Sequence, residues 1–173
     1  MASDRRPTGV STDGAGLDAT NRRLLAELQG DARLSLAELG RRVGLSSPAV
    51  AERLGRLERD DIVRGYHADV DPRALGYALS VVIRVRPAPR RLADVAAAAA
   101  ESPEVVECDR ITGEDCFVVR AHVRDVEHLE ELIDRFTPFG QTTSSIVQSS
   151  PVARRGVHLG AEVDAVTGGD QRR

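Results

Sequence analysis

Lysine is absent from this 173-residue sequence, and all 24 of its Lys or Arg positions are Arg. Because Ala and Gly are abundant too, this absence is typical of a GC-rich coding bias, and we attach no functional meaning to it. Long apolar runs are also missing. None could span a bilayer, and residues 1–16 are polar and Gly-rich without a signal-peptide core. We therefore expect a cytoplasmic protein with no membrane partner.

Cysteine occurs only twice, at Cys108 and Cys116, on what the pattern predicts to be adjacent strands. A two-residue turn at Gly113–Glu114 would pair Cys108 with Val119 and put the two sulfurs on opposite faces of the hairpin. We therefore expect no disulfide, which agrees with a reducing compartment. The two thiols and His122 match none of the common zinc spacings, so we predict neither a metal site nor a cofactor.

Catalytic motifs are not legible in the sequence. It contains no Gly-rich phosphate loop and no Ser-His-Asp or Cys-His arrangement, and its four His residues are scattered. These absences predict that the protein is not an enzyme.

The net charge of −3 argues against a basic protein that coats DNA. Nine Arg stand against eight acidic residues in residues 18–67, and thirteen Arg stand against seventeen acidic residues from Ala68 onward. An N-terminal half so close to neutrality favours site-specific, multivalent DNA binding over purely electrostatic binding.

The clearest pattern is a pair of short amphipathic helices joined by a tight turn within residues 35–66. Ser35 and Glu38 predict a capping box, in which the Ser35 hydroxyl accepts from the Glu38 amide and the Glu38 side chain reaches back. Gly44 predicts a left-handed residue that ends this helix. Its apolar stripe consists of Leu36, Leu39 and Val43.

The second helix of the pair is predicted to start with Ser47 as its N-cap and Pro48 at its first position. Its inward side consists of Val50, Leu54 and Leu57. On the other side small residues come first and arginines follow, and this order lets a helix N-terminus approach base edges while Arg forks onto guanine or phosphate. We predict double-stranded DNA as the partner, contacted by Ser46, Ser47, Ala49, Arg53 and Arg56. An ordinary helical pair with a solvated charged face is the alternative.

Flanking patterns complete a winged helix-turn-helix domain over residues 17–68. Asp18 is predicted to cap a preceding helix, which ends near Gly30. Its buried side consists of Asn21, Leu24, Leu25 and Leu28. Residues 62–68 predict the wing, as a hairpin or a single strand.

Residues 79–152 switch repeatedly between strand-like and helix-like periodicity. The predicted strands are 79–85, 105–112, 116–123 and 142–148, and the predicted helices follow the stripes Leu92, Val95, Ala96, Ala99 and Val126, Leu129, Ile133, Phe136. This order builds a ferredoxin-like βαββαβ domain, so the fold class is α+β, with four antiparallel strands and both helices on one face. The other face needs a cover, and Val82, Ile111 and Val118 are apolar enough to be covered.

Three segments lie outside the two predicted domains. Residues 1–16 have no periodicity and are predicted to be a disordered tail. Residues 69–78 form a linker around a Pro and a Gly. Residues 153–173 are predicted to be an edge segment and a flexible tail, in which the stretch 152–159 could add a strand and the tail begins at Gly160.

Several of these residues carry a resemblance to a known family. They are Leu17-Asp18, Asp31-Ala32-Arg33, Leu45-Ser46, Arg53-Leu54-Gly55-Arg56-Leu57-Glu58 and Ile62-Val63-Arg64-Gly65-Tyr66. These runs resemble the DNA-binding half of the Lrp/AsnC (feast/famine) family of transcriptional regulators, and the match extends from Leu17 to about Val152. Asp61 departs from the family's usual glycine before the wing, but Asp tolerates a left-handed backbone better than most residues. Asn21 departs from a common acidic residue.

The resemblance implies an effector pocket between neighbouring ligand-sensing domains, lined by the turn at Thr112, Gly113 and Asp115. A plain hairpin turn would have the same composition. Asp115 would meet the ammonium of an amino acid, and the hydroxyls of the polar run that includes Thr143 and Ser144 would meet its carboxylate. An exposed polar edge strand is the alternative for that run. The family also implies a homodimer and often an octamer of four dimers.

The sequence therefore predicts a sequence-specific DNA-binding transcriptional regulator that responds to an amino acid or related small metabolite. The alternative is a small-molecule-binding or enzymatic ferredoxin-like module whose helix-turn-helix serves protein contacts. A gel shift on the DNA upstream of its own gene, at two salt concentrations, distinguishes the two.

Overall fold

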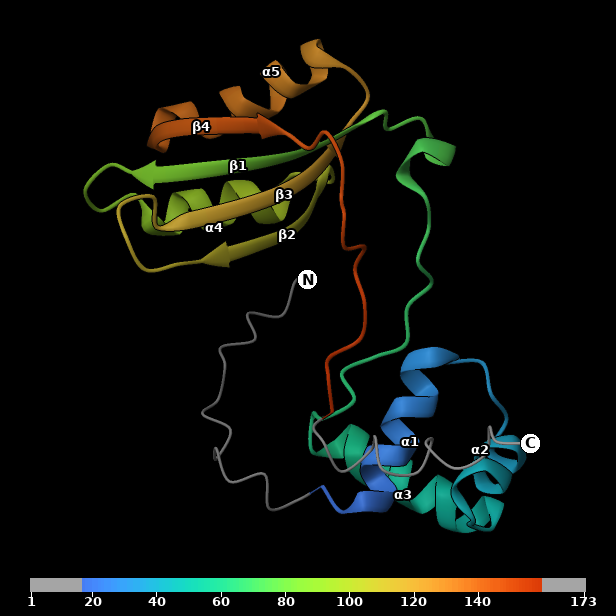
Figure 1. Cartoon of the computed structure of the whole chain (residues 1–173). Coiled ribbons are helices and arrows are strands. Elements are labelled where there is room, and N and C mark those ends of the chain that lie inside the picture. The colour runs from blue at the N-terminus through green and yellow to red at the C-terminus, as the bar shows by residue number, and fades with distance from the viewer. Residues whose placement is uncertain (1–16, 160–173) are drawn as a thin grey trace. The chain divides into compact units, whose positions relative to one another are not determined.

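The computed structural model describes residues 17–159, so the predicted disordered tail at 1–16 and flexible tail at 160–173 lie outside the described residues. The described chain forms two compact units (Figure 1). One unit is Asp69–Pro151. The other combines residues 17–68 with residues 152–159, so the chain leaves this unit and later returns to it.

Three helices form the first unit: α1 (Ala19–Gly30), α2 (Leu36–Val43) and α3 (Ser47–Arg59). Their buried core consists of Leu24, Leu25, Leu39, Val43, Val50, Leu54 and Leu57. The predicted stripes of all three helices point into this core, except that Leu36 is 41% exposed. Leu36 is the first residue of α2, and its side chain lies at the margin of the core.

The predicted caps are confirmed in part. The Asp18 carboxylate accepts from the Asn21 amide at 2.6 Å, and the Ser35 hydroxyl accepts from the Glu38 amide at 3.1 Å. The reciprocal half of the capping box is wrong, because the Glu38 carboxylate binds two guanidinium groups of its own helix, Arg41 and Arg42. The cap of α3 is also shifted by one residue, since Ser46 and not Ser47 accepts from the Ala49 amide.

The turn between α2 and α3 depends on two glycines. Gly44 is left-handed at φ 77°, as predicted. Gly40, which lies within α2, has the Leu45 carbonyl oxygen 2.4 Å from where its Cβ would be, so any larger residue would collide with the turn backbone. This close approach lets the two helices pack with a very short connection.

The predicted wing strand at residues 62–68 is wrong. The amides of Ile62 and Val63 instead bond to the Leu57 carbonyl, at 2.9 and 3.0 Å, after a left-handed residue at Asp61 (φ 59°). These bonds fold the chain back onto the end of α3, and within residues 17–159 no strand pairs with this segment to complete a ladder. Further on, the predicted linker contains a short 3-10 helix, Pro72–Leu75.

The second unit has the predicted ferredoxin-like order. Its elements are β1 (Leu79–Pro87), α4 (Leu92–Glu101), β2 (Val105–Arg110), β3 (Phe117–Val123), α5 (Val126–Asp134), the 3-10 helix η2 (Thr137–Phe139) and β4 (Gly140–Ile146). All neighbouring strands are antiparallel, in the order β2-β3-β1-β4 (Figure 1). The fold class is confirmed.

Alternate residues of the central strands divide the sheet into two faces. One face packs under both helices, and its core consists of Val81, Ile83, Val85, Phe117, Val119, Ala121 and Val123 with Val95, Ala99, Leu129, Leu132 and Phe136. Val126, which we predicted to lie in the α5 stripe, is 53% exposed. Leu132 and His128 are buried on that side of α5 instead.

The predicted register of the β2–β3 hairpin is confirmed, since Cys108 pairs with Val119. The connection is longer than a two-residue turn, because the ladder stops at Arg110 and Phe117 and leaves a loop at residues 111–116. Both thiols are free. Burial raises the pKa of the Cys108 thiol, with a smaller contribution from Asp109.

Residues 152–159 form no edge strand, contrary to the prediction. They lie against α1, where Arg22 donates to the Leu159 carbonyl at 2.7 Å and Gln29 donates to the Val157 carbonyl at 3.1 Å. Leu159 packs against the core of the first unit. The carbonyls that a strand would use are thus bound by side chains of a helix.

Candidate DNA-binding surface and effector site

The outer side of α3 is the candidate DNA-reading surface. At 100° per residue, the positions opposite the buried Val50, Leu54 and Leu57 are Pro48, Glu52, Arg56 and Arg59, and all four are exposed. Among the predicted DNA contacts, Ser46 and Arg56 are exposed, whereas Ser47, Ala49 and Arg53 are half-buried. The most exposed side of α3 therefore contains only part of the predicted DNA-contact set and includes residues that we did not predict.

Arg53 is held against α1. We had predicted that it lies opposite the buried side of α3, and this prediction is wrong. Its guanidinium donates to the Asp18 carboxylate at 2.6 Å and to the Asn21 side-chain oxygen at 3.0 Å. One helical turn separates Arg53 from the buried Leu57, so its position flanks the core. The hydrogen bond from Arg53, followed by that from the Asn21 amide, lowers the pKa of Asp18. Arg53 thus ties α3 to α1.

Arg56 and Arg59 are the cations that α3 presents outward. Arg56 makes one exposed ion pair, with Glu52 at 3.3 Å. Arg59 has no ion pair or hydrogen bond among residues 17–159, and its Nη1 lies 3.3 Å from where a Cβ on Gly55 would be. Sequence analysis missed Arg59 because it counted residues only up to Arg56, although the same helical spacing marks both.

The uncovered sheet face carries charge as well as apolar residues. Val82 and Val118 are half-buried there, as expected, but the registers put Arg84 beside Val118 and Arg120 beside Val82. On the same face, Ser80 and His122 share a hydrogen bond of 3.0 Å. Only two valines of these strands therefore form an apolar centre on this face.

The loop predicted to line the effector pocket meets two of these arginines. The Asp115 carboxylate lies 3.8 Å from both Arg84 and Arg86, and Glu114 pairs with Arg86. Asp115 thus belongs to a group of two carboxylates and two guanidinium groups, which the sequence analysis did not foresee. Gly113, at φ 108°, gives the exposed loop its sharp bend.

Thr143 and Ser144 are adjacent in β4, so their side chains point to opposite faces of the sheet. Thr143 pairs with Arg84 on the uncovered face, whereas Ser144 pairs with Ile83, whose side chain is in the core under the helices. The structure therefore gathers Thr143, Arg84 and Asp115 and leaves Ser144 out. Adjacent residues of a strand point to opposite faces of the sheet, but periodicity alone does not show that β4 lies beside β1 or in which register.

A buried charged cluster was not predicted at all. Glu104 accepts from His128 Nε2 at 2.8 Å and from Arg135 at 3.0 and 3.2 Å. His128 Nδ1 accepts from the Arg124 amide at 3.3 Å, so Nε2 is the ring nitrogen that donates to Glu104. Burial raises the pKa of Glu104, but the bonds from His128, its own amide and Arg135, with the Arg135 charge, outweigh burial and bring the pKa to about 2.

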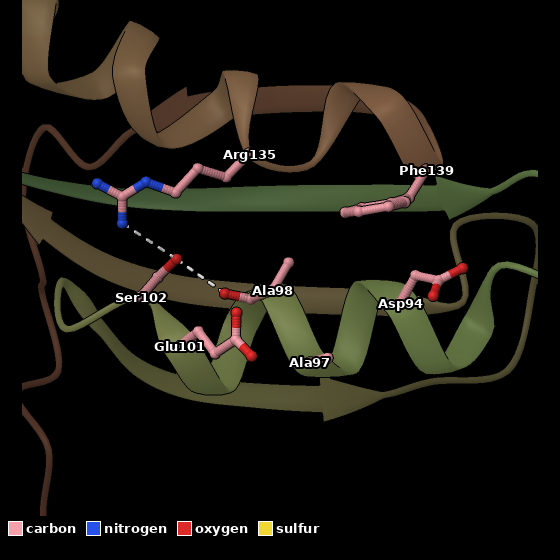
Figure 2. A pocket seen from close by; sticks show the side chains of 7 residues that line it. All are labelled: Asp94, Ala97, Ala98, Glu101, Ser102, Arg135 and Phe139. Atoms are coloured by element: carbon pink, nitrogen blue, oxygen red, sulfur yellow. Dashed lines mark hydrogen bonds between the residues drawn. The ribbon is translucent and has the colours of Figure 1, made fainter.

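Arg135 of this cluster also lines a cavity of about 450 Å³ beside α4 (Figure 2). It is lined by Asp94, Ala97, Ala98, Glu101, Ser102, Arg135 and Phe139. The Arg135 side chain reaches across it to the Ser102 hydroxyl at 3.3 Å, and Ser102 in turn donates to the Ala98 carbonyl (Figure 2). Among residues 17–159, Arg135 is the only cation that lines this cavity, and its guanidinium already donates to Glu104 and Ser102. The cavity therefore has fewer available charged groups for a ligand than the β2–β3 loop has. None of the predicted effector residues lines it.

Two negative findings concern the described residues alone. In residues 17–159 no three His, Cys, Asp or Glu side chains are grouped as metal binding would require. No helix in the same range is both long enough and apolar enough to cross a membrane.

A helix-turn-helix unit joined to a ferredoxin-like unit with a charged, uncovered sheet face defines a DNA-binding transcriptional regulator with a sensing domain. Comparison with known proteins agrees. The AsnC-type helix-turn-helix domain matches residues 17–58, and the Lrp/AsnC ligand binding domain matches residues 80–157. The chain belongs to the Lrp/AsnC family of transcriptional regulators, as its sequence predicted.

Relatives match this chain over most of their own length. The HTH-type transcriptional regulator LrpA of Mycobacterium tuberculosis is 36% identical over 137 residues, which cover 79% of this chain and 89% of LrpA. The M. tuberculosis feast or famine regulatory protein Rv3291c, solved in complex with L-methionine, superposes with a TM-score of 0.78 at 34% identity, covering 83% of this chain and 99% of that one. The regulator NMB0573 of Neisseria meningitidis, also solved with L-methionine, gives 0.76 at 30% identity, covering 83% and 97%.

These matches favour the regulator over the alternative in which the helix-turn-helix serves only protein contacts. Both halves of the chain are matched, and the relatives that match them are named as transcriptional regulators.

Proposed function

We propose that the protein reads DNA with the outer side of α3 and alters that binding when an amino acid or related small metabolite occupies the sheet face beside residues 111–116. The observation that carries this proposal is the group of two arginines and two carboxylates at that loop. Its two signs suit a zwitterion, and two structurally similar regulators were solved with the zwitterion L-methionine.

For DNA, we assign direct contacts to the start of α3 and to Arg56. Ser46, Ser47 and Ala49 are small enough for the helix N-terminus to approach base edges, and the exposed Arg56 is free to exchange Glu52 for guanine or phosphate. Arg53 is a positioning residue in this proposal, because both of its bonds go to the first residues of the α1 region.

The test of this assignment is Arg56→Ala, measured by gel shift on the DNA upstream of the protein's own gene and on an unrelated duplex. Loss of one good base contact costs about 1–3 kcal/mol, so we expect roughly a 10-fold to 100-fold weaker specific complex. Arg91→Ala is the matched control, since Arg91 makes an exposed ion pair with Asp94 in the other unit. Wild-type affinity in the Arg56 variant would remove this side of α3 from the DNA interface.

For the effector, we assign the ligand carboxylate to Arg84 and Arg86 and the ligand ammonium to Asp115. Charge-assisted hydrogen bonds of this kind are stronger than the hydroxyl contacts that the sequence suggested for the carboxylate. Thr143 lies beside Arg84 and adds a hydroxyl on the same face. Thr112 and Gly113 supply loop backbone that a ligand can approach closely.

Calorimetric titration with L-methionine tests the effector site. We expect Asp115→Ala to weaken binding by at least about tenfold, equal to 1.4 kcal/mol, and to abolish any methionine-dependent change in DNA binding while leaving ligand-free DNA binding intact. Asp94→Ala is the control, because Asp94 pairs with Arg91 away from this loop. If wild type binds methionine and the Asp115 variant binds it equally well, the site lies elsewhere.

For assembly, we propose a homodimer in which the uncovered sheet face is the interface, with an octamer of four dimers as the larger form. Val82 and Val118 form the apolar centre of this interface. The charged residues around them, Arg84 and Arg120, are expected to fix how the two sheets align. Sedimentation of the full chain at micromolar concentration checks this, and Val118→Glu is expected to shift it toward monomer. We place this DNA-binding protein in the cytoplasm.

A further inference from the structure

Residues 153–159 are a structural part of the DNA-binding unit, although they come after the whole sensing unit in the chain. The segment is held by the bond from Arg22 to the Leu159 carbonyl, by the bond from Gln29 to the Val157 carbonyl, and by the packing of Leu159 against the core. Gly156 fits closely, because a Cβ there would lie 2.1 Å from the Gln29 side-chain oxygen. The segment therefore has a fixed position on α1.

The contacts also fix the direction of the segment. Arg22 and Gln29 are seven residues apart on one stripe of α1, so the bound segment runs antiparallel to the helix, with Val157 at the α1 C-terminal end. That end of α1 lies beside the C-terminal end of α3, since Leu28, Glu58 and Tyr66 line one groove. Residues that precede Val157 therefore continue beyond the C-terminal end of α1, the end that shares this groove with α3.

Two of those preceding residues are arginines. Arg154 and Arg155 are both exposed, and among residues 17–159 neither has an ion pair or a hydrogen bond. An extended chain advances at most about 3.6 Å per residue, so Arg154 is anchored within about 11 Å of Val157. Arg59 and Arg64, at the end of α3 and just after it, are unpaired by the same criterion.

The segment changes the charge of the DNA-binding unit. Residues 17–68 hold nine Arg and eight acidic residues, a formal charge of +1, and residues 152–159 add two Arg and no acid, which makes it +3. Ion pairs with carboxylates already engage Arg41, Arg42, Arg53 and Arg56 of this unit. Arg154 and Arg155 therefore add two cations to this unit that no carboxylate among residues 17–159 neutralises in an ion pair.

We propose that Arg154 and Arg155 bind phosphates of the DNA backbone beside the sequence that α3 reads. This inference rests on the proposed function, since it needs DNA on α3. Phosphates are the partner that the chemistry favours, because two unpaired guanidinium groups on a docked, extended segment offer charge and donors but no groove-reading element. Such contacts strengthen binding to any sequence and leave sequence preference unchanged.

The experiment measures the affinity of the full chain for the duplex from upstream of its own gene, and for an unrelated duplex of equal length, over a range of salt concentrations. For Arg154→Ala/Arg155→Ala, we expect the slope of log K against log salt to become shallower by about 2, because each lost phosphate contact removes about 0.9. The ratio of affinities for the two duplexes stays at the wild-type value.

Two further variants separate the causes. Arg90→Ala/Arg91→Ala removes the same charge from the sensing unit and is expected to keep the wild-type slope. Leu159→Ser keeps both arginines but removes the apolar anchor, and we expect it to reproduce the shallower slope. A wild-type slope in the Arg154/Arg155 variant overturns the proposal, and a wild-type slope in Leu159→Ser overturns the assigned role of docking. Failure of wild type to bind either duplex would instead refute the proposed function.

Discussion

The two units use charged side chains in opposite ways. In the DNA-binding unit, ion pairs join the helices at the surface: Arg53 of α3 binds Asp18, and Arg42 of α2 binds Glu27 of α1, with all four side chains at least 33% exposed. In the sensing unit, one carboxylate, Glu104, is buried and receives bonds from two residues of a different segment, His128 and Arg135.

This difference predicts different sensitivities. Exposed pairs are screened by salt and contribute little each, whereas a buried carboxylate that loses a partner leaves a desolvated charge behind. The sensing unit is therefore expected to be robust to salt and sensitive to changes at Glu104. The DNA-binding unit is expected to be softened by salt, in the same range in which its DNA contacts weaken.

The largest expected effect is that of Glu104→Ala. It leaves the Arg135 guanidinium and the His128 ring without their common acceptor, and breaking a buried pair in this way costs about 3–5 kcal/mol. Hydrogen exchange of the β3 and α5 amides reports the loss for this unit separately. Glu107→Ala in β2, three residues after Glu104, is the control, because the Glu107–Arg120 pair is exposed and its loss should be close to neutral. An equal loss of stability in the two variants would contradict the claim that the buried Glu104 cluster matters more than exposed ion pairs.

Acid is expected to act through the same carboxylate. The pKa of Glu104 falls from 4.5 to about 2 on folding, so this group stabilises the folded state above pH 4.5, and the contribution is lost as the pH falls toward 2. A shift of this size corresponds to roughly 3 kcal/mol. Unfolding of the full chain followed between pH 5 and pH 2 should show this loss in wild type, and a weaker pH dependence in Glu104→Gln, which cannot titrate.

The smallest expected effect is that of Arg53→Ala. Its pair with Asp18 is partly exposed, so we expect about 0.2–1 kcal/mol of destabilisation, confined to the amides of α1 and α3 and diminishing at high salt. Arg41→Ala, whose pair with Glu38 stays within one exposed helix, should leave those amides unchanged. A loss that persists at high salt would mean that Arg53 acts mainly through packing of its aliphatic stem.

Sequence analysis succeeded where the information is local. Asp18, Ser35 and Gly44 act within one helical turn of their own positions, and the alternation of strand and helix periods sufficed for the ferredoxin-like order. The family resemblance added the class of regulator, which no local rule contains. The proposed contact residues still await experiment.

The failures involve partners distant in sequence. Arg53 meets Asp18 across 35 residues, and Glu104 meets Arg135 across 31, so the pattern around either arginine resembles that of a solvated face. Ser144 was misplaced for a similar reason, because its direction depends on the register of β4 beside β1. The partner of Gly40, the Leu45 carbonyl, is close in sequence, but only the folded turn shows that it excludes a side chain.

The docking of Leu159 on α1 also orders events during synthesis. The contact from Arg22 to Leu159 spans 137 residues, so the ribosome has synthesised the whole sensing unit, Asp69–Pro151, before this partner of α1 exists. The three helices can form early, since their own core is local in sequence, but a nascent regulator still lacks the segment that carries Arg154 and Arg155. In the proposed role of these two arginines, contacts with DNA phosphates become possible only after the sensing unit has been synthesised.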